Sequence, residues 1–217
     1  MIQRGTAVGE NPGPMLPRTP MPTEQDTLLQ IAQRYAQLGM QVAKAFHQKQ
    51  AELELDEVLR QERLSTADGT EESLAVLEVL RELTQTHQQA YQKIMVAFAG
   101  EMARALEALP EAVRDAERDR IVPLLEWQFT AQREFYENRE RWIAAAEAVC
   151  ELIDDRRPTL TFTDDGVLFR DDEDLERFQG LMTTLDELHQ REVEQVEQRV
   201  ERMKRSAAVL GMKFSDS

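Results

Sequence analysis

Residues 71–109, EESLAVLEVLRELTQTHQQAYQKIMVAFAGEMARALEAL, determine the expected fold because apolar side chains recur along them at the period of an α-helix. Their spacing of three or four residues repeats every eleven residues, which places them on one face of a nearly straight helix. That face consists of Val76, Leu80, Leu83, His87, Tyr91, Ile94, Phe98, Met102, Ala105 and Leu109. At about 1.5 Å per residue, such a helix is about 60 Å long. The stretch therefore predicts a rod whose apolar face other helices must cover.

Apolar spacing also predicts a long helix at each end of the chain. The first is expected over residues 24–64, with Thr23 as its cap, and a turn should follow at residues 65–70. The last is expected over residues 171–210, and the acidic run at residues 171–174 suits its positive N-terminal end. Its apolar face consists of Phe178, Met182, Leu185, His189, Val193, Val196, Val200, Met203, Ala207 and Leu210.

Two prolines divide the segment that follows the central rod. A break or kink is expected at both Pro110 and Pro123, with a short helix between them, because proline lacks an amide donor and clashes with the preceding turn. A third long helix should then continue to Asp155. Its apolar face includes Trp127, Ala131, Phe135, Trp142, Ala146, Val149 and Ile153.

Residues 159–169, TLTFTDDGVLF, carry the pattern of a β-hairpin. Asp165-Gly166 between two short apolar runs is typical of a tight type I′ turn. A turn at that position pairs Phe162 with Phe169. The face directed at the helices should then consist of Leu160, Phe162, Val167 and Phe169, since a lone hairpin is only marginally stable.

The predicted fold is therefore all-α: an elongated bundle or coiled coil of about four long helices, with one small β-hairpin before the last helix. Residues 24–217 are expected to form a single domain. Residues 1–23 are rich in proline and predict a disordered tail. That tail is either a plain solvated segment or a ligand for a groove that binds polyproline helices.

The charge balance argues against several classes of partner. The chain has 26 Lys and Arg against 41 Asp and Glu, a net charge of −15. This disfavours nucleic acid and disfavours adhesion to anionic lipid, because both interactions need basic surface. Cys150 is the only cysteine, so no disulfide can form within the chain, and we expect a cytoplasmic location. No apolar run is long enough to span a membrane, and no signal-peptide pattern begins the chain.

The sequence contains no pattern that predicts catalysis or a cofactor. It lacks a phosphate-binding loop, a dinucleotide fingerprint, a nucleophile elbow and a Cys-x-x-Cys pair. A ferritin-like metal bundle remains an alternative because His87 and His189 fall on apolar faces, but only Asp186 and His189 have the spacing of its ligand motif. We therefore expect no enzyme activity, no metal and no cofactor.

A shortage of acidic residues marks one end of the expected bundle. No Asp or Glu occurs between Asp26 and Glu52, or between Glu82 and Glu101, and these stretches lie side by side if the first two helices form an antiparallel hairpin. We predict a self-association surface there, with burial inside a single bundle as the alternative. Its residues are Tyr35, Leu38, Val42, Phe46, Tyr91, Ile94, Met95 and Phe98. A candidate basic patch near the C-terminus consists of Arg199, Arg202, Lys204, Arg205 and Lys213.

Two short stretches resemble the BAR family of membrane-shaping domains. Residues 121–127, IVPLLEW, resemble the Pro-Leu step in the second helix of that family, and residues 131–136, AQREFY, resemble the Ala-Gln-x-x-Tyr stretch of its last helix. The resemblance implies long kinked helices in a dimer that presents a curved face to a membrane. Our leading expectation is a homodimeric helical scaffold or adaptor that binds an unidentified protein partner, and a BAR-like peripheral membrane protein is the alternative.

Overall fold

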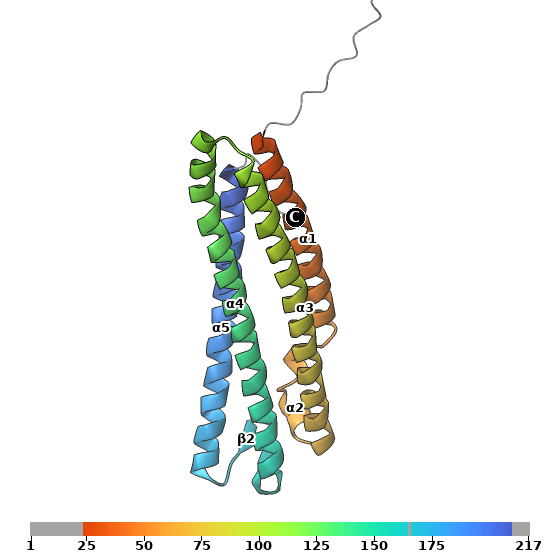
Figure 1. Ribbon diagram of the computed structural model, residues 1–217. Helices are drawn as coiled ribbons and strands as arrows, with labels where there is room; N and C mark the ends of the chain where they lie inside the picture. The colour runs from red at the N-terminus through yellow and green to blue at the C-terminus, as the bar shows by residue number, and fades with distance from the viewer. Residues whose placement is uncertain (1–23, 165, 210–217) are drawn as a thin grey trace, which may run out of the picture.

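The computed structural model describes residues 24–164 and 166–209, with side chains for residues 27–164, 166–198 and 200–202. Four long helices lie along one axis and give the molecule the shape of a rod (Figure 1). They are α1 (Glu24–Ala51), α3 (Ala67–Glu107), α4 (Glu111–Arg156) and α5 (Asp172–Val209). The shorter elements are α2 (Gln61–Leu64), two 3-10 turns (Leu55–Glu57 and Arg157–Thr159), β1 (Thr161–Thr163) and β2 (Gly166–Leu168). The predicted all-α bundle with one small hairpin before the last helix is confirmed.

The long helices pack mainly as successive antiparallel neighbours. α3 packs against both α1 and α4, and α4 packs against both α3 and α5. The start of α1 and the end of α5 lie at the same end of the rod, which we call the far end, and the hairpin lies at the other (Figure 1). A chain of antiparallel neighbours follows from short connections between rods of similar length.

The core consists of three separate clusters of buried side chains along the rod. The hairpin-end cluster contains Val58, Leu64, Leu77, Leu80, Ile143, Ala145, Ala146, Val149, Cys150, Ile153 and Leu185. The middle cluster contains Phe46, Phe135 and Tyr136. The far-end cluster contains Leu28, Met102, Leu106, Leu109 and Ile121. Among the described side chains, α5 therefore contributes to the hairpin-end cluster, whereas the far-end cluster draws on α1, α3, α4 and the connection after α3.

The first helix ends at Ala51 and not at Leu64, so the prediction of one helix over residues 24–64 is wrong. In a continuous helix, Leu53 and Leu55 would project about 200° apart, and one of them would face solvent. The chain leaves the helix there, with Glu54 in the left-handed region at φ 47° and ψ 52°. Both leucines then pack against the hairpin-end cluster.

α3 begins at Ala67, inside the segment predicted to be a turn. Thr66 caps the helix because its Oγ1 accepts a hydrogen bond from the backbone N–H of Gly69 at 3.0 Å. A Cβ at Gly69 would overlap the carbonyl oxygen of Arg63 and lie 2.9 Å from its carbonyl carbon. Glycine at this position therefore allows α2 to pack directly against the first turn of α3.

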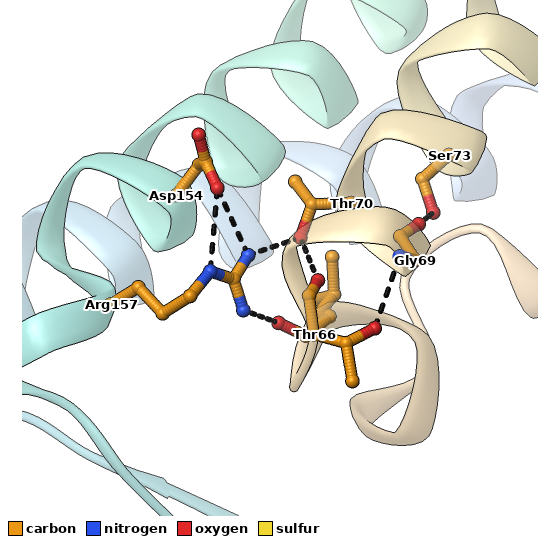
Figure 2. A network of polar contacts seen from close by, with 7 residues as sticks. Thr66, Gly69, Thr70, Ser73, Asp154 and Arg157 are labelled. Carbon is orange, nitrogen blue, oxygen red and sulfur yellow. Dashed lines mark hydrogen bonds and ion pairs between the residues drawn. The ribbon is translucent and has the colours of Figure 1, made fainter.

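Polar contacts fasten this junction to the end of α4 (Figure 2). The Arg157 guanidinium donates to the carbonyl oxygen of Leu64 at 2.8 Å and to Oγ1 of Thr70 at 2.5 Å. The same group forms an ion pair with Asp154 at 3.2 Å. Ser73 Oγ donates to the carbonyl oxygen of Val58 at 2.7 Å. Two of these contacts satisfy the backbone carbonyls of Leu64, at the end of α2, and of Val58, before it.

α4 runs without a break through Pro123, so the predicted short helix between the two prolines is wrong, whereas the break at Pro110 is confirmed. A kink at Pro123 stays a prediction. Pro110 precedes the helix with ψ 141°, as expected of a proline at a helix start. Pro123 itself is exposed, and its neighbours Ile121 and Leu125 both pack against the far-end cluster. Packing on both sides of Pro123 holds the helix together despite the missing amide donor.

The hairpin differs from the prediction in its register. Phe162 pairs with Val167, and Gly166 pairs with Thr163, so the predicted pairing of Phe162 with Phe169 is wrong. Gly166 adopts φ 139° as a paired strand residue and is not part of the turn. The register moves by an even number of residues, which leaves each side chain on its predicted face. Leu160, Phe162, Val167 and Phe169 accordingly all pack against the hairpin-end cluster.

Candidate interaction surface

The residues predicted to mediate self-association lie mostly between α1 and α3 of the same chain. Phe46 and Met95 are buried, so these two residues are not available to a second subunit. Among the eight residues, Leu38 is exposed, at 39%, and the remaining five, Tyr35, Val42, Tyr91, Ile94 and Phe98, are partly buried. Phe46 and Met95 are therefore buried within one bundle, which was the alternative to self-association. For the other six residues, self-association stays a prediction.

Contacts within the chain account for much of this α1–α3 surface. The ring of Tyr35 lies 5.3 Å from that of Phe98, and Phe46 stacks on His87 at 4.4 Å. The hydroxyl of Tyr35 donates to Glu101 Oε1 at 2.8 Å. This hydrogen bond is the main cause that raises the pKa of Tyr35 and lowers the pKa of Glu101. These contacts join α1 to α3 within one subunit through Tyr35, Phe46 and Phe98.

An exposed apolar stripe occurs instead on the far-end half of α5. Val193, Val196 and Val200 are 38%, 45% and 43% exposed, and we call them the valine stripe. Nearer the hairpin, Leu185 and Leu188 on the same helix are buried. The stripe is exposed because the described part of the far-end cluster is built from other helices and leaves this face of α5 incompletely covered.

α4 does not cover the valine stripe because it contacts a neighbouring face of α5. Nδ2 of Asn138 donates to the carbonyl oxygen of Leu188 at 2.9 Å, and Arg139 forms an ion pair with Glu192. Further along, the Arg202 guanidinium lies over the ring of Trp127, 4.2 Å from its centroid. These contacts define the side of α5 that faces α4. Because successive residues of a helix are 100° apart, the three valines project from an adjacent side of α5 and not towards α4.

The Arg139–Glu192 pair is buried deeply enough to have electrostatic consequences. Burial lowers the pKa of the Arg139 guanidinium, and the nearby Glu192 carboxylate opposes that change. The pair fixes the register of α4 against α5 in the middle of the rod, because a buried charge without its partner is strongly destabilising.

Charge is distributed unevenly along the helix that carries the valine stripe. Residues 186–197 contain five acidic residues and one basic residue, a net charge of −4. Residues 198–209 contain four basic residues and one acidic residue, a net charge of +3. Four of the five residues of the predicted basic patch, all but Lys213, belong to this second half. Its Arg202 packs on Trp127, the side chains of Arg199, Lys204 and Arg205 lie outside those described, and Lys213 lies outside the described residues.

Sequence alone placed the valine stripe on the apolar face of the last helix, and one signal within that face sets it apart. From His189 onward, the apolar positions of this helix alternate strictly in steps of four and three residues, ending at Leu210. The central rod instead follows an eleven-residue repeat. A strict seven-residue repeat is typical of a helix that forms a coiled coil with another helix.

Across residues 24–164 and 166–209, no group of three or more His, Cys, Asp and Glu side chains is arranged to hold a metal ion. None of the helices described is both long and apolar enough to cross a membrane. Cys150 is buried, and burial raises the pKa of its thiol to about 11, so the thiol stays protonated at neutral pH.

The fold and this surface define a class of protein: a rod-shaped helical bundle with a coiled-coil-type stripe exposed on its last helix. No family model, curated protein or solved structure matches the chain.

Proposed function

We propose that the protein is a non-enzymatic helical scaffold that self-associates through α5 and offers the rest of its rod to a protein partner. The observation that carries this proposal is the exposure of Val193, Val196 and Val200 at coiled-coil spacing. Monomeric proteins expose single apolar side chains routinely, whereas an aligned stripe is typical of an interaction site. The single buried Cys150 suits a reducing compartment, so we place the scaffold in the cytoplasm.

The energy available from the stripe predicts a weak and reversible association. Full burial of one valine side chain contributes roughly 1.5–3 kcal/mol, and about two fifths of each stripe side chain remains to be buried. Three valines in each of two subunits then contribute on the order of 4–7 kcal/mol. Association costs roughly 4–15 kcal/mol of translational and rotational freedom. The stripe therefore needs help from the apolar positions that follow it in sequence, and we expect a monomer–dimer equilibrium rather than a permanent dimer.

Sedimentation velocity over a wide concentration range tests the proposal. The wild-type sedimentation coefficient should rise with concentration, and Val196→Glu should remain monomeric because it places a charge in the apolar interface. Val79→Glu is the matched control, since Val79 is an exposed valine on α3 outside the stripe and its substitution should leave association unchanged. Circular dichroism checks that both variants stay folded.

Two sedimentation results would overturn the proposal. One is a wild-type chain that stays monomeric at every concentration. The other is an equal loss of association in the Val79→Glu and Val196→Glu variants, which would mean that the stripe is not the interface. Pelleting of the wild-type protein with anionic vesicles at low salt would favour the membrane-binding alternative in place of a scaffold.

A further inference from the structure

We infer that two copies of the chain pair antiparallel along the far-end halves of their α5 helices, and this inference rests on the proposed self-association. The observation behind it is that the valine stripe occupies the boundary between an acidic and a basic half of one helix. Val196 and Val200 lie on either side of residue 198, where the sign of the charge changes.

Charge selects the orientation of the pair. In a parallel pair, residues 186–197, with net charge −4, would lie against the same segment of the partner, and residues 198–209, with net charge +3, would do likewise. In an antiparallel pair centred near residue 198, each acidic segment lies against a basic one. Like charges held side by side oppose association and opposite charges favour it, so the antiparallel arrangement is the more stable.

The apolar positions fit the same arrangement. An antiparallel pair centred at residue 198 places Val196 opposite the partner subunit's Val200, and Val193 opposite the partner subunit's Met203. His189 falls opposite the partner subunit's Ala207. Each apolar position of one helix thus meets an apolar or half-polar position of the other. Every pairing occurs twice, as the two-fold symmetry of a homodimer requires.

Cysteine cross-linking with a short bifunctional maleimide tests the orientation. His189 is exposed, and the native Cys150 is buried, so the wild-type chain serves as the unreactive control. In the antiparallel pair, the two copies of residue 189 lie about 27 Å apart, since they are offset by 18 residues at about 1.5 Å each. We expect His189→Cys alone to give no cross-linked dimer. A mixture of His189→Cys and Ala207→Cys should give a cross-linked heterodimer.

The outcomes separate failure of this inference from failure of the proposed function. Efficient cross-linking of His189→Cys to itself would show a parallel pair and overturn the orientation while leaving self-association intact. A dimer in sedimentation without any cross-link would show that α5 is not the interface. A chain that sediments as a monomer would overturn both the antiparallel pairing and the proposed self-association. The valine stripe would then be a binding surface for a different protein.

Salt provides a second, independent readout. Raising the ionic strength from about 0.05 M to about 0.5 M shortens the screening length severalfold. The antiparallel pair should dissociate more readily at high salt, by several-fold in its dissociation constant, because attraction across the pair is screened. Tighter association at high salt would indicate repulsion between like segments and would contradict the antiparallel arrangement.

Discussion

The close approach of α2 to α3 predicts that Gly69→Ala destabilises the protein, although alanine is the better helix former. In an open helix position, replacing glycine by alanine stabilises by about 1 kcal/mol. At Gly69 the added Cβ would overlap the Arg63 carbonyl oxygen and lie 2.9 Å from both the Arg63 carbonyl carbon and Thr66 Oγ1. Two of these three atoms belong to the backbone of the α2 turn, so a side-chain rotation cannot relieve the overlap.

The size of the effect follows from the contacts that must move. Overpacking at a tight site costs about 1–3 kcal/mol. A shift of the α2 turn also weakens the Thr66 cap, worth about 1 kcal/mol, and the hydrogen bond from Arg157 to Leu64, worth about 1.5–3 kcal/mol when fully lost. After the gain in helix propensity is subtracted, we expect Gly69→Ala to lower the free energy of unfolding by about 2–4 kcal/mol.

Gly180→Ala provides the matched control for this experiment. Gly180 lies in α5, and no atom comes within 4 Å of a Cβ built there, so alanine should raise the free energy of unfolding by about 0.5–1 kcal/mol. Urea unfolding followed by far-ultraviolet circular dichroism measures both variants against the wild type. A Gly69→Ala protein at least as stable as the wild type would refute the close approach of α2 to α3.

Two further predictions concern buried groups. Glu192→Gln should lower the free energy of unfolding by about 3 kcal/mol, because Arg139 keeps its charge inside the bundle. An Arg139→Met/Glu192→Met double variant should recover most of that loss. Urea unfolding measures both variants, and a Glu192→Gln protein as stable as the wild type would contradict the buried pair. Burial raises the Cys150 pKa from 9.0 to about 11, so the stability carried by its protonated thiol is complete below about pH 9 and is lost as the pH rises toward 11. Cys150→Ala should remove that part of the alkaline loss in urea titrations at a series of pH values, and an equal loss in both proteins would argue against it.

Local periodicity was enough to predict the architecture but not the interruptions. The apolar positions from Val76 to Leu109 predict α3 because every turn of that helix places an apolar side chain on the same face. Periodicity did not reveal the end of α1 at Ala51, since Leu53 and Leu55 leave the helix only to reach a cluster formed by distant segments. The continuity of α4 at Pro123 likewise depends on packing by Ile121 and Leu125, which no local rule includes.

The interaction surface was harder to predict because exposure depends on which faces remain uncovered after folding. A sequence stripe shows that a helix needs a partner, but it does not show whether that partner belongs to the same chain. Phe46 and Met95 are buried by other parts of the same chain, whereas Val196 remains 45% exposed. The change from an eleven-residue to a seven-residue repeat was the available signal, and it distinguishes Val196 and Val200 from the positions that precede them.

Because the core is divided into three clusters along the axis, the two ends of the rod are not equally well anchored. At the hairpin end, three long helices, α2 and the hairpin share one large cluster, whereas α1 is attached chiefly through α3. Local opening should begin where the fewest buried contacts must be broken. Amide hydrogen exchange would then run as a gradient, fastest in α1 and slowest around Ile143 and Leu77. A second copy docked on the valine stripe would slow exchange in the far-end half of α5 and leave the fast exchange of α1 unchanged.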